Sequence, residues 1–442
     1  MRVRVLSARS AYGKNEKSDV IVVGAGIIGL SCAYHIKSEN PNLKVIVVDK
    51  AAAAGQGDTA KSAGAVRNVF TSDVNRLLAD TSLDFYGHVQ QDLGFNLDLS
   101  FVGYLWLLTD EEFRRLGGLV DSVRSEGVQV KIWERTDLRD MITGMNMDFT
   151  ESDEEARVLG LGNIFKGLQG IKCGTVSPDL IVNFYEQEFR KAGGSIVYNT
   201  KIESLLLEPT SKLGILGEPL IWQDKKIVGV RTQGGSLYAE TTVIATGRWT
   251  SQLLDSVGID SRIKPKKRQI FSLRSPKIEA LLETKGFNEH NLMPFTILPR
   301  AGVLMRPERA ERGFWVGAAD ELGRPFMFEE DPQAERDYYT YNIYPILSKY
   351  FPHFKDVTPT NMWAGQYDVN TMDANPYIFE EADVIVAAGL SGSGIMKADA
   401  VGRIVAALYA EKEHADLYGG REIKVSRLGV TERNVGIERF VL

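Results

Sequence analysis

The chain has 442 residues, of which 44% are hydrophobic, and a formal net charge of −6 at pH 7. This length and composition predict a large buried core divided among about two or three domains. The charges form no basic block, which argues against nucleic acid as the main partner. The sequence shows no apolar run of about 18 residues and no charged-then-apolar leader, so we expect neither a membrane span nor a signal peptide.

Cysteine and histidine usage narrows the class of protein further. The two cysteines, Cys32 and Cys173, are too few for a disulfide framework, so we expect a protein of the reducing cytoplasm, with peripheral membrane contact left open. The histidines show no spacing typical of metal ligands, and we predict no metal site; they are His35, His88, His290, His353 and His414. Residues 1–18 are a polar, basic lead-in. The role of the tail ending in residues 440–442 and the oligomeric state, including a homo-oligomer, stay open.

The first predicted unit is a strand, a glycine turn, a helix and a second strand between residues 19 and 49. The apolar run 20–23 leads into Gly24-Ala25-Gly26-Ile27-Ile28-Gly29. Gly24 permits a tight turn, Gly26 lets backbone approach a pyrophosphate, and Gly29 allows close packing of helix on strand. The helix N-terminus favours the anion, and Asp49 suits a ribose hydroxyl and disfavours a 2′-phosphate. The pattern predicts a dinucleotide site, with a structural turn as the alternative, and does not separate NAD from FAD.

Further helices and strands follow along the chain, and two of the turns between them repeat the arrangement of a strand that leads into glycine. A helix over 180–190 is followed by Gly193-Gly194 and a strand over 195–198. Short strands over 220–223, 226–232 and 236–245 predict a β-meander that ends at Thr246-Gly247, where backbone can approach a cofactor. A strand over 384–388 then leads into the glycine loop 389–394 and a helix over 395–410. This loop suits an oxygen-rich or anionic ligand edge, and a merely flexible turn is the alternative.

These motifs together resemble one family. The sequence is similar to the FAD-dependent amine oxidoreductases of the D-amino-acid oxidase, glycine oxidase and sarcosine oxidase superfamily. The resemblance covers nearly the whole chain, and its matching segments are 24–29, Thr59 with 62–67, 176–178, 245–249, 363–365 and 389–394. Within the superfamily, segments 103–105, 305–308 and 363–368 are most similar to the branch of the sarcosine oxidase β-subunit, dimethylglycine dehydrogenase and archaeal dye-linked L-proline dehydrogenases.

The resemblance implies an α/β (α+β) fold with a Rossmann-like FAD-binding domain assembled from discontinuous segments and a mixed-sheet substrate domain. We expect residues 1–100, 173–262 and 365–442 in the first domain and residues 101–172 and 263–364 in the second. Gly365 stands where some relatives attach flavin to cysteine, so FAD should be non-covalent. The residues expected to bind it are Gly24, Gly26, Ile28, Gly29, Asp49, Lys50, Thr59, Ser62, Ala63, Gly64, Ala65, Ile202, Ala245, Thr246, Gly247, Trp249, Gly365, Gly389, Leu390, Gly392, Ser393, Gly394, Ile395, Met396 and Lys397.

The resemblance also implies substrate-site residues. Arg67 follows the segment expected beside the flavin, and its planar guanidinium matches a carboxylate, although a structural ion pair or a contact to the flavin's pyrimidine edge is as good an interpretation. Tyr367 stands where D-amino-acid and glycine oxidases carry an arginine, and it either bonds the substrate carboxylate or is a core aromatic. Arg306 either acts in the site or braces the domain interface. Trp315 occupies the position of the oxygen-activating lysine of monomeric sarcosine oxidases.

We therefore expect an FAD-dependent dehydrogenase that oxidises the C–N bond of a small secondary amino acid, first L-proline to 1-pyrroline-5-carboxylate, with a quinone or dye as acceptor. The absence of a lysine at position 315 removes a fixed cation that would favour reaction with oxygen. Alternatives are a sarcosine or dimethylglycine type dehydrogenase or oxidase, an oxidase of 2-hydroxy acids, and a flavoprotein-like assembly factor without turnover.

Overall fold

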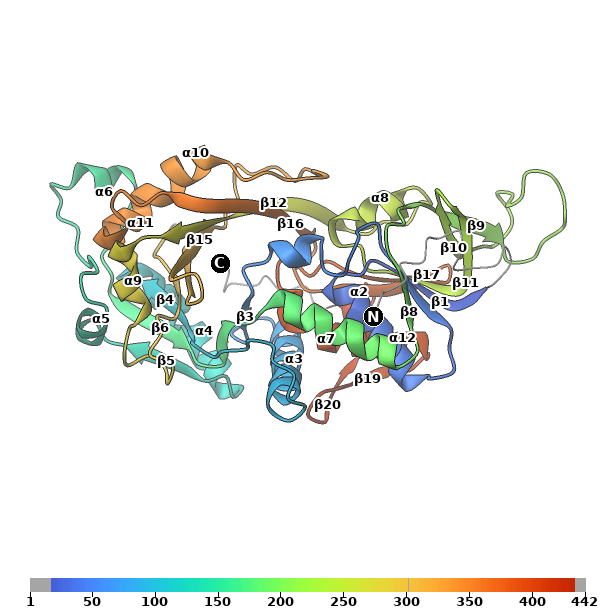
Figure 1. Ribbon diagram of the computed structural model, residues 1–442, viewed down its shortest axis with the longest axis horizontal. Coiled ribbons are helices and arrows are strands. Elements are labelled where there is room, and N and C mark those ends of the chain that lie inside the picture. Colours follow the sequence, from blue (N-terminus) through green and yellow to red (C-terminus); the bar gives the residue numbers. More distant parts are fainter. Residues whose placement is uncertain (1–16, 301, 434–442) are drawn as a thin grey trace, which may run out of the picture.

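The computed structural model describes residues 17–300 and 302–433, so the first sixteen residues and the tail over 440–442 considered above lie outside the described residues. Two large β-sheets lie at opposite ends of an elongated molecule, and the long strands β12 (Ile263–Arg274) and β16 (Pro359–Asn370) run between them (Figure 1). Helices cover both ends. The predicted α/β fold with a Rossmann-like part and a mixed-sheet part is confirmed.

The first sheet carries the Rossmann-like unit. Its strand order is β17-β18-β11-β1-β2-β8, and all neighbours except β17 and β18 pair in parallel. Parallel strands are buried on both faces, which explains the continuous apolar runs at 20–23 and 384–388. The strands are β1 (Ser18–Val23), β2 (Val45–Val48), β8 (Ser195–Val197), β11 (Gly235–Ile244), β17 (Tyr377–Glu381) and β18 (Val384–Ala388).

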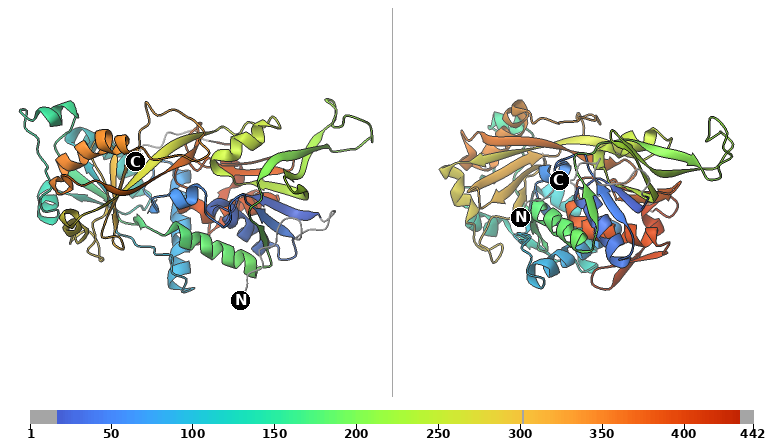
Figure 2. Two further views of the ribbon diagram at one scale, coloured as in Figure 1. Left: turned by 45° about the horizontal axis from the view of Figure 1, so that its top comes forward. Right: turned by 45° about the vertical axis from the view of Figure 1, so that its right-hand side comes forward.

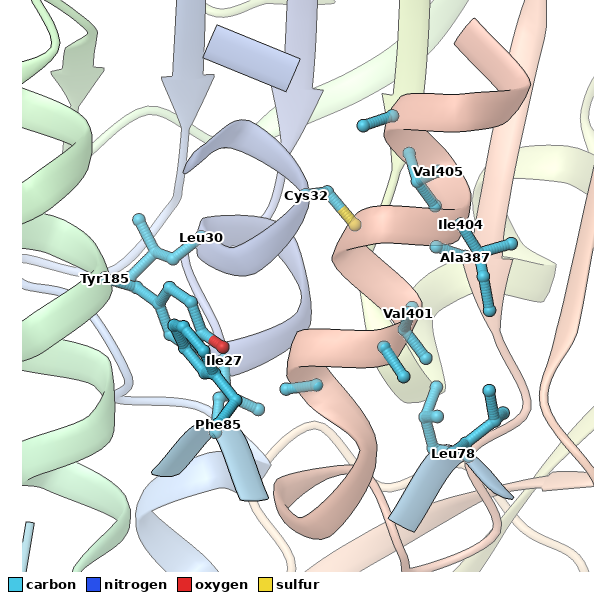
Figure 3. Close-up of a cluster of buried hydrophobic side chains, with 14 of the residues drawn as sticks. Ile27, Leu30, Cys32, Leu78, Phe85, Tyr185, Ala387, Val401, Ile404 and Val405 are labelled. Carbon is cyan, nitrogen blue, oxygen red and sulfur yellow. The ribbon is translucent and has the colours of Figure 1, made fainter. Parts of the chain in front are cut away.

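Helices α2 (Ile27–Glu39), α7 (Pro178–Lys191) and α12 (Ala398–Tyr409) pack beside one another against this sheet, together with α3 (Asp73–Gln91). Cys32 on α2 is fully buried and faces α12, which carries Val401, Ile404 and Val405 (Figure 3). The helix predicted over 395–410 begins as a single 3-10 turn, η5 (Ile395–Lys397), before α12.

The second sheet has the order β16-β12-β15-β14-β13-β4-β6-β5 and is antiparallel except for β13 and β4. Successive side chains along each strand point to opposite faces of the sheet. One face, with Phe271, Met305 and Phe314, packs on α9 (Pro276–Leu282) and α11 (Tyr344–Tyr350), and the other faces the first sheet. The remaining strands are β4 (Tyr104–Leu108), β5 (Val130–Trp133), β6 (Lys166–Gly170), β13 (Phe295–Ile297), β14 (Val303–Glu308) and β15 (Gly313–Ala318).

The smaller elements complete the chain. They are the strand pairs β3 (Ala65–Arg67) with β7 (Cys173–Thr175) and β19 (His414–Leu417) with β20 (Arg421–Lys424), and the helices α4 (Asp110–Ser125), α5 (Arg135–Met141), α6 (Glu154–Val158), α8 (Thr250–Asp255), α9 (Pro276–Leu282), α10 (Arg336–Tyr338) and α11 (Tyr344–Tyr350). Short turns of helix are η1 (Asp58–Lys61), η2 (Gly247–Trp249), η3 (Tyr339–Ile343), η4 (Pro352–Phe354) and η6 (Val425–Leu428). The predicted segment boundary at 364/365 lies inside β16, and the division into segments stays a prediction.

The predicted meander is wrong in its first strand. Residues 220–223 are not a strand, and the partner of β10 (Lys225–Thr232) is instead β9 (Ile202–Pro209). The reason is local, because the Glu218 and Gln223 side chains accept the backbone N–H groups of Leu213, Gly214 and Leu220 and so compete with strand pairing. Residues 210–224 form a loop that projects beyond β9 and β10 (Figure 2).

Candidate functional site

A cavity of about 1560 Å³ lies between the two large sheets. It is lined by the residues that follow the carboxyl ends of β1, β11 and β18, and by the facing side of β12 and β16. Such a switch-point edge is where open α/β sheets bind ligands. Typical small-ligand pockets measure about 300–1,000 Å³. The cavity therefore has room for an extended dinucleotide and a small molecule beside it.

The turn after β1 is built by close backbone approach. Gly24 has φ +107°, and a Cβ there would lie 2.4 Å from the carbonyl oxygen of Ala245, at the end of β11. A Cβ on Gly29 would lie 1.9 Å from the carbonyl oxygen of Gly24. Gly24 and Gly26 line the cavity, whereas Gly29 lies behind it and lets α2 begin directly against the strand. The Ile27 N–H donates to Thr59 Oγ1 at 3.3 Å, which ties η1 to this turn.

Asp49 lines the cavity and also fixes the turn. Its carboxylate accepts the N–H of Ala25 at 2.6 Å and that of Ala51 at 2.7 Å. A carboxylate has about four lone-pair sites, so acceptor capacity for a ribose hydroxyl is left. The predicted ribose contact stays a prediction.

The glycine loop 389–394 is held by the end of β16. The half-buried carboxylate of Asp368 accepts the Gly389 N–H at 2.8 Å and the Leu390 N–H at 3.3 Å. Burial, with a smaller contribution from the charge of Asp58, raises the pKa of Asp368 to about 6. Gly392 packs directly on the ring of Tyr367, where a Cβ would lie 2.3 Å from a ring carbon. The end of β16, in the second sheet, thus sets the position of this loop.

Lys397 lies behind the glycine loop 389–394, outside the cavity lining. It is fully buried, does not line the cavity, and donates to Asn75 Oδ1 at 2.6 Å and to Ser393 Oγ at 2.5 Å. Asn75 and Ser393 both line the cavity. The lysine therefore orients two cavity groups rather than facing the cavity itself.

Arg67 brings a buried positive charge to the cavity wall. Its guanidinium donates to the carbonyl of Val69 at 3.0 Å and lies over the Phe70 ring at 4.3 Å. Among the described residues, no carboxylate forms an ion pair with it. A buried charge is stable only when it is paired, so the cavity favours an anionic group next to Arg67.

Tyr367 lines the same cavity and lies near two guanidinium groups. The Arg268 guanidinium is 5.1 Å from its ring centre, and burial raises the pKa of Tyr367 while Arg268 and Arg67 act in the opposite direction. The Tyr367 hydroxyl forms no hydrogen bond with another described residue. Tyr104 and Phe295, stacked at 4.1 Å, add an apolar part of the wall.

Arg306 and Trp315 do not line the cavity. Arg306 pairs with Glu308, and its guanidinium lies 4.3 Å from the Trp315 ring centre. The Trp315 indole donates to Glu311 at 3.2 Å. Arg306 is two residues from the cavity-lining Leu304 and so lies on the same face of β14, one position beyond the wall. Their predicted roles stay predictions.

Most of the predicted cofactor residues share the cavity. Those that line it are Gly24, Gly26, Ile28, Asp49, Lys50, Thr59, Ser62, Ala63, Ala65, Ile202, Ala245, Thr246, Gly247, Trp249, Gly365, Leu390, Gly392, Ser393, Gly394, Ile395 and Met396. Gly64 and Gly389, like Gly29 and Lys397, lie behind the wall. A Cβ on Gly64 would lie 2.4 Å from the Val176 carbonyl oxygen, and one on Gly389 2.8 Å from Ile263 Cδ1.

Sequence reasoning missed several charged residues of the wall. Arg248 donates to Asp58 at 2.7 Å, and Asp58 also accepts the Gln366 N–H at 2.9 Å, which joins η1 to β16. Burial raises the pKa of Asp58. Arg248 and Asp368 lie within the matching motifs, whose charged members were a usable signal, but Arg268 had none.

Metal and membrane features were also sought. Across residues 17–300 and 302–433, His, Cys, Asp and Glu side chains form no group of three or more able to hold a metal ion. In the same part of the chain, no helix combines the length and the apolar character needed to cross a bilayer.

Comparison with known proteins decides the family. A model of the DAO family, described as FAD dependent oxidoreductase, matches residues 19–408. The chain belongs to this family. The resemblance inferred from the motifs is thereby confirmed, and so is dependence on FAD.

Named relatives and solved structures match most of the length of this FAD-dependent oxidoreductase. FAD-dependent oxidoreductase domain-containing protein 1 of Xenopus laevis is 24% identical over 430 residues, covering 90% of this chain and 80% of the relative. L-proline dehydrogenase from P. horikoshii has a TM-score of 0.73 and 21% identity, covering 94% of this chain and 97% of that one. Glycine oxidase from Geobacillus kaustophilus has a TM-score of 0.72 and 20% identity, with coverage of 96% and 100%.

The cavity of this FAD-dependent oxidoreductase fits its cofactor. Backbone at Gly24, Gly247 and Gly392 has positive φ, and these three turns line one continuous space. Positive φ is readily adopted only by glycine, and it lets bare backbone face a ligand. Gly365 also lines the space, and a Cβ there would lie 2.8 Å from Lys61 Cβ. Non-covalent attachment stays a prediction.

Proposed function

We propose that this FAD-dependent oxidoreductase is a dehydrogenase that oxidises the C–N bond of a small secondary amino acid, first L-proline, and passes the electrons to a quinone or dye. The observation that carries the proposal is the buried guanidinium of Arg67, which lines the cavity without a carboxylate partner among the described residues. An amino-acid carboxylate supplies the missing charge and matches the guanidinium geometry.

The remaining wall suits the rest of such a substrate. Arg67 binds and orients the carboxylate, and the Tyr367 hydroxyl donates a second hydrogen bond to it. Tyr104, Phe295 and Leu304 give the apolar surface that a small aliphatic ring needs, and they exclude water from the reacting bond.

When bound, FAD supplies the acceptor for two electrons. The substrate loses a hydride from carbon and a proton from nitrogen, giving an imine. A dedicated base is not needed if the amine binds neutral. The protein orients the amine and sets the local charge, and residues 389–394, held by Asp368, fix the wall against which this happens.

Two features support the proposed activity, one for the dehydrogenase and one for its first substrate. Trp315 stands where relatives that use oxygen carry a lysine, and indole bears no charge to stabilise a reduced oxygen species. The similarity in fold to L-proline dehydrogenase from P. horikoshii supports the first choice of substrate.

The test is a panel of secondary amines, amino acids and 2-hydroxy acids, scored by dye reduction under air and under argon. Highest kcat/KM for L-proline, equal under both gases, supports the proposal. A preference for sarcosine or dimethylglycine moves the protein to that branch, and a preference for 2-hydroxy acids replaces amine oxidation. Reduction of bound FAD by no compound of the panel favours an assembly role.

A further inference from the structure

The loop between β9 and β10 exposes apolar side chains far from the cavity. It lies at the right-hand end of Figure 1 and projects beyond both sheets. Ile221 is 94% exposed and Trp222 67%. The full set of exposed large apolar residues here, called the apolar tip below, is Leu213, Ile215, Leu216, Ile221 and Trp222. Contiguous exposed apolar residues of this kind mark interaction sites.

Several polar groups of the loop form hydrogen bonds with one another. The Glu218 carboxylate accepts the N–H groups of Leu213 at 2.7 Å and Gly214 at 3.1 Å, and the Gln223 amide at 2.9 Å. Gln223, which is buried, also accepts the Leu220 N–H at 2.7 Å. Polar groups that are satisfied within the loop reduce the free energy needed to move it out of water. The tip is thus ordered with its apolar side chains facing out.

Lysines stand directly behind the tip. Lys212 precedes it, and Lys225 and Lys226 follow it at the start of β10. Three carboxylates accompany them: Glu208, which pairs with Lys212 at 2.6 Å, Glu218 within the loop, and the exposed Asp224. The three lysines and three carboxylates balance, so the base of the loop carries no net charge. Trp with aliphatic side chains ahead of lysines is the pattern of segments that enter a membrane interface.

We propose that the apolar tip inserts into the interfacial layer of a lipid bilayer, with the lysines at its base at the level of the headgroups. Size argues against a second protein chain, because each side of a stable protein interface contributes about 20–30 residues. The tip is one short loop. A bilayer needs no complementary shape and accepts so small an anchor.

The experiment uses the full-length FAD-loaded protein and two kinds of vesicle, phosphatidylcholine alone and phosphatidylcholine mixed with phosphatidylglycerol. The variant L216S/W222S removes the two side chains most suited to insertion, and L322S is the matched control, because Leu322 is 100% exposed on a different loop. Co-sedimentation should fall about 10- to 100-fold for L216S/W222S and be unchanged for L322S.

Two further readouts locate the contact. The emission of Trp222, taken as the difference between the unmodified protein and W222F, should shift to shorter wavelength on adding vesicles. Because the charges at the base of the loop balance, the unmodified protein should bind the two kinds of vesicle within about threefold of each other. Dye-linked turnover in solution should be equal in all variants, since the tip lies outside the cavity lining.

Failure of the unmodified protein to bind either vesicle would overturn the proposal, as would binding that survives L216S/W222S. If the protein instead dimerises with concentration and L216S/W222S abolishes this, the tip is an interface between copies. Co-sedimentation and the emission of Trp222 require no substrate, so their outcome is independent of the proposed function.

Discussion

The two ends of the cavity are built by different means. At the first sheet, turns of bare backbone line the space, and their glycines are required by contacts as short as 1.9 Å from a would-be Cβ. At the second sheet, side chains from separate strands form the wall, with Tyr104 from β4 and Tyr367 from β16, and Arg67 is added from β3 of the separate β3–β7 pair. The first-sheet side, our proposed cofactor end, should therefore tolerate almost no change at these glycines, whereas the second-sheet side, our proposed substrate end, can change while the fold persists.

The largest effect should come from a substitution in the glycine turn that follows β1. Gly24→Ala places a methyl group 2.4 Å from the Ala245 carbonyl oxygen on backbone with φ +107°. We expect a loss of about 3 kcal/mol of unfolding free energy and of bound flavin. Urea unfolding and the flavin-to-protein absorbance ratio measure both. Gly87→Ala on α3 is the control, because its Cβ meets nothing within 4 Å, and it should be neutral or stabilising by about 0.5–1 kcal/mol. Equal losses in both variants would contradict the steric explanation.

Substitution at the substrate end should leave the fold intact and remove turnover. Arg67→Leu should lower kcat/KM for amino acids about 10- to 150-fold, because a charge-assisted contact contributes about 1.5–3 kcal/mol. A neutral amine analogue should lose less. Arg306→Leu is the comparison, since Arg306 is already paired with Glu308 and does not line the cavity. If Arg67→Leu slows both substrates equally, Arg67 serves the flavin or the fold.

Asp368, at the end of β16, holds the glycine loop 389–394, and its ionisation should make the free energy of unfolding depend on pH. Its pKa, about 6 against an ordinary value of 3.8, means that the folded protein holds this proton more tightly than the unfolded chain does. Its contribution to stability is therefore full below about pH 4 and is lost as pH rises through 6, by at most about 3 kcal/mol. Asp368→Asn should abolish that part of the fall, measured by urea unfolding at saturating FAD across this pH range. The exposed Asp260→Asn should keep the unmodified profile, and parallel profiles for all three proteins would contradict the assignment.

The smallest effect concerns the rate at which the reduced protein reacts with oxygen. The reduced protein should react with oxygen at least about tenfold more slowly than with a dye, because indole at position 315 offers no fixed charge. Trp315→Lys should raise the oxygen rate only modestly, since position 315 is outside the cavity lining. Stopped-flow mixing of reduced protein with each acceptor measures both rates. Peroxide formation by the unmodified protein at its dye-linked rate would refute the dehydrogenase assignment.

The cofactor end was predictable because its signals are local. Gly24, Gly26 and Asp49 lie within one strand-helix-strand unit, and the turns at 246–247 and 389–394 each follow their own apolar strand. Joining the three turns into one FAD site required the family resemblance.

The substrate end was less accessible to sequence reasoning. Arg67 and Tyr367 are 300 positions apart, and whether Arg67 has a carboxylate partner depends on how distant segments pack. The same is true of Arg306, whose partner Glu308 is only two residues away but whose distance from the cavity is set by strand order. The predicted strand over 220–223 failed because side-chain hydrogen bonds within the loop replaced strand pairing.

The contact between Tyr367 and Gly392 bears on how such a protein changes substrate over evolution or in a laboratory library. A ring carbon of Tyr367 occupies the space where residue 392 would carry a Cβ, so both the size and the chemistry of residue 367 act on the loop beside the cofactor. Selection for a new substrate at position 367 is then also selection on flavin retention. Variants there that look inactive should be assayed again with added FAD before their specificity is judged, because the two properties share one physical contact.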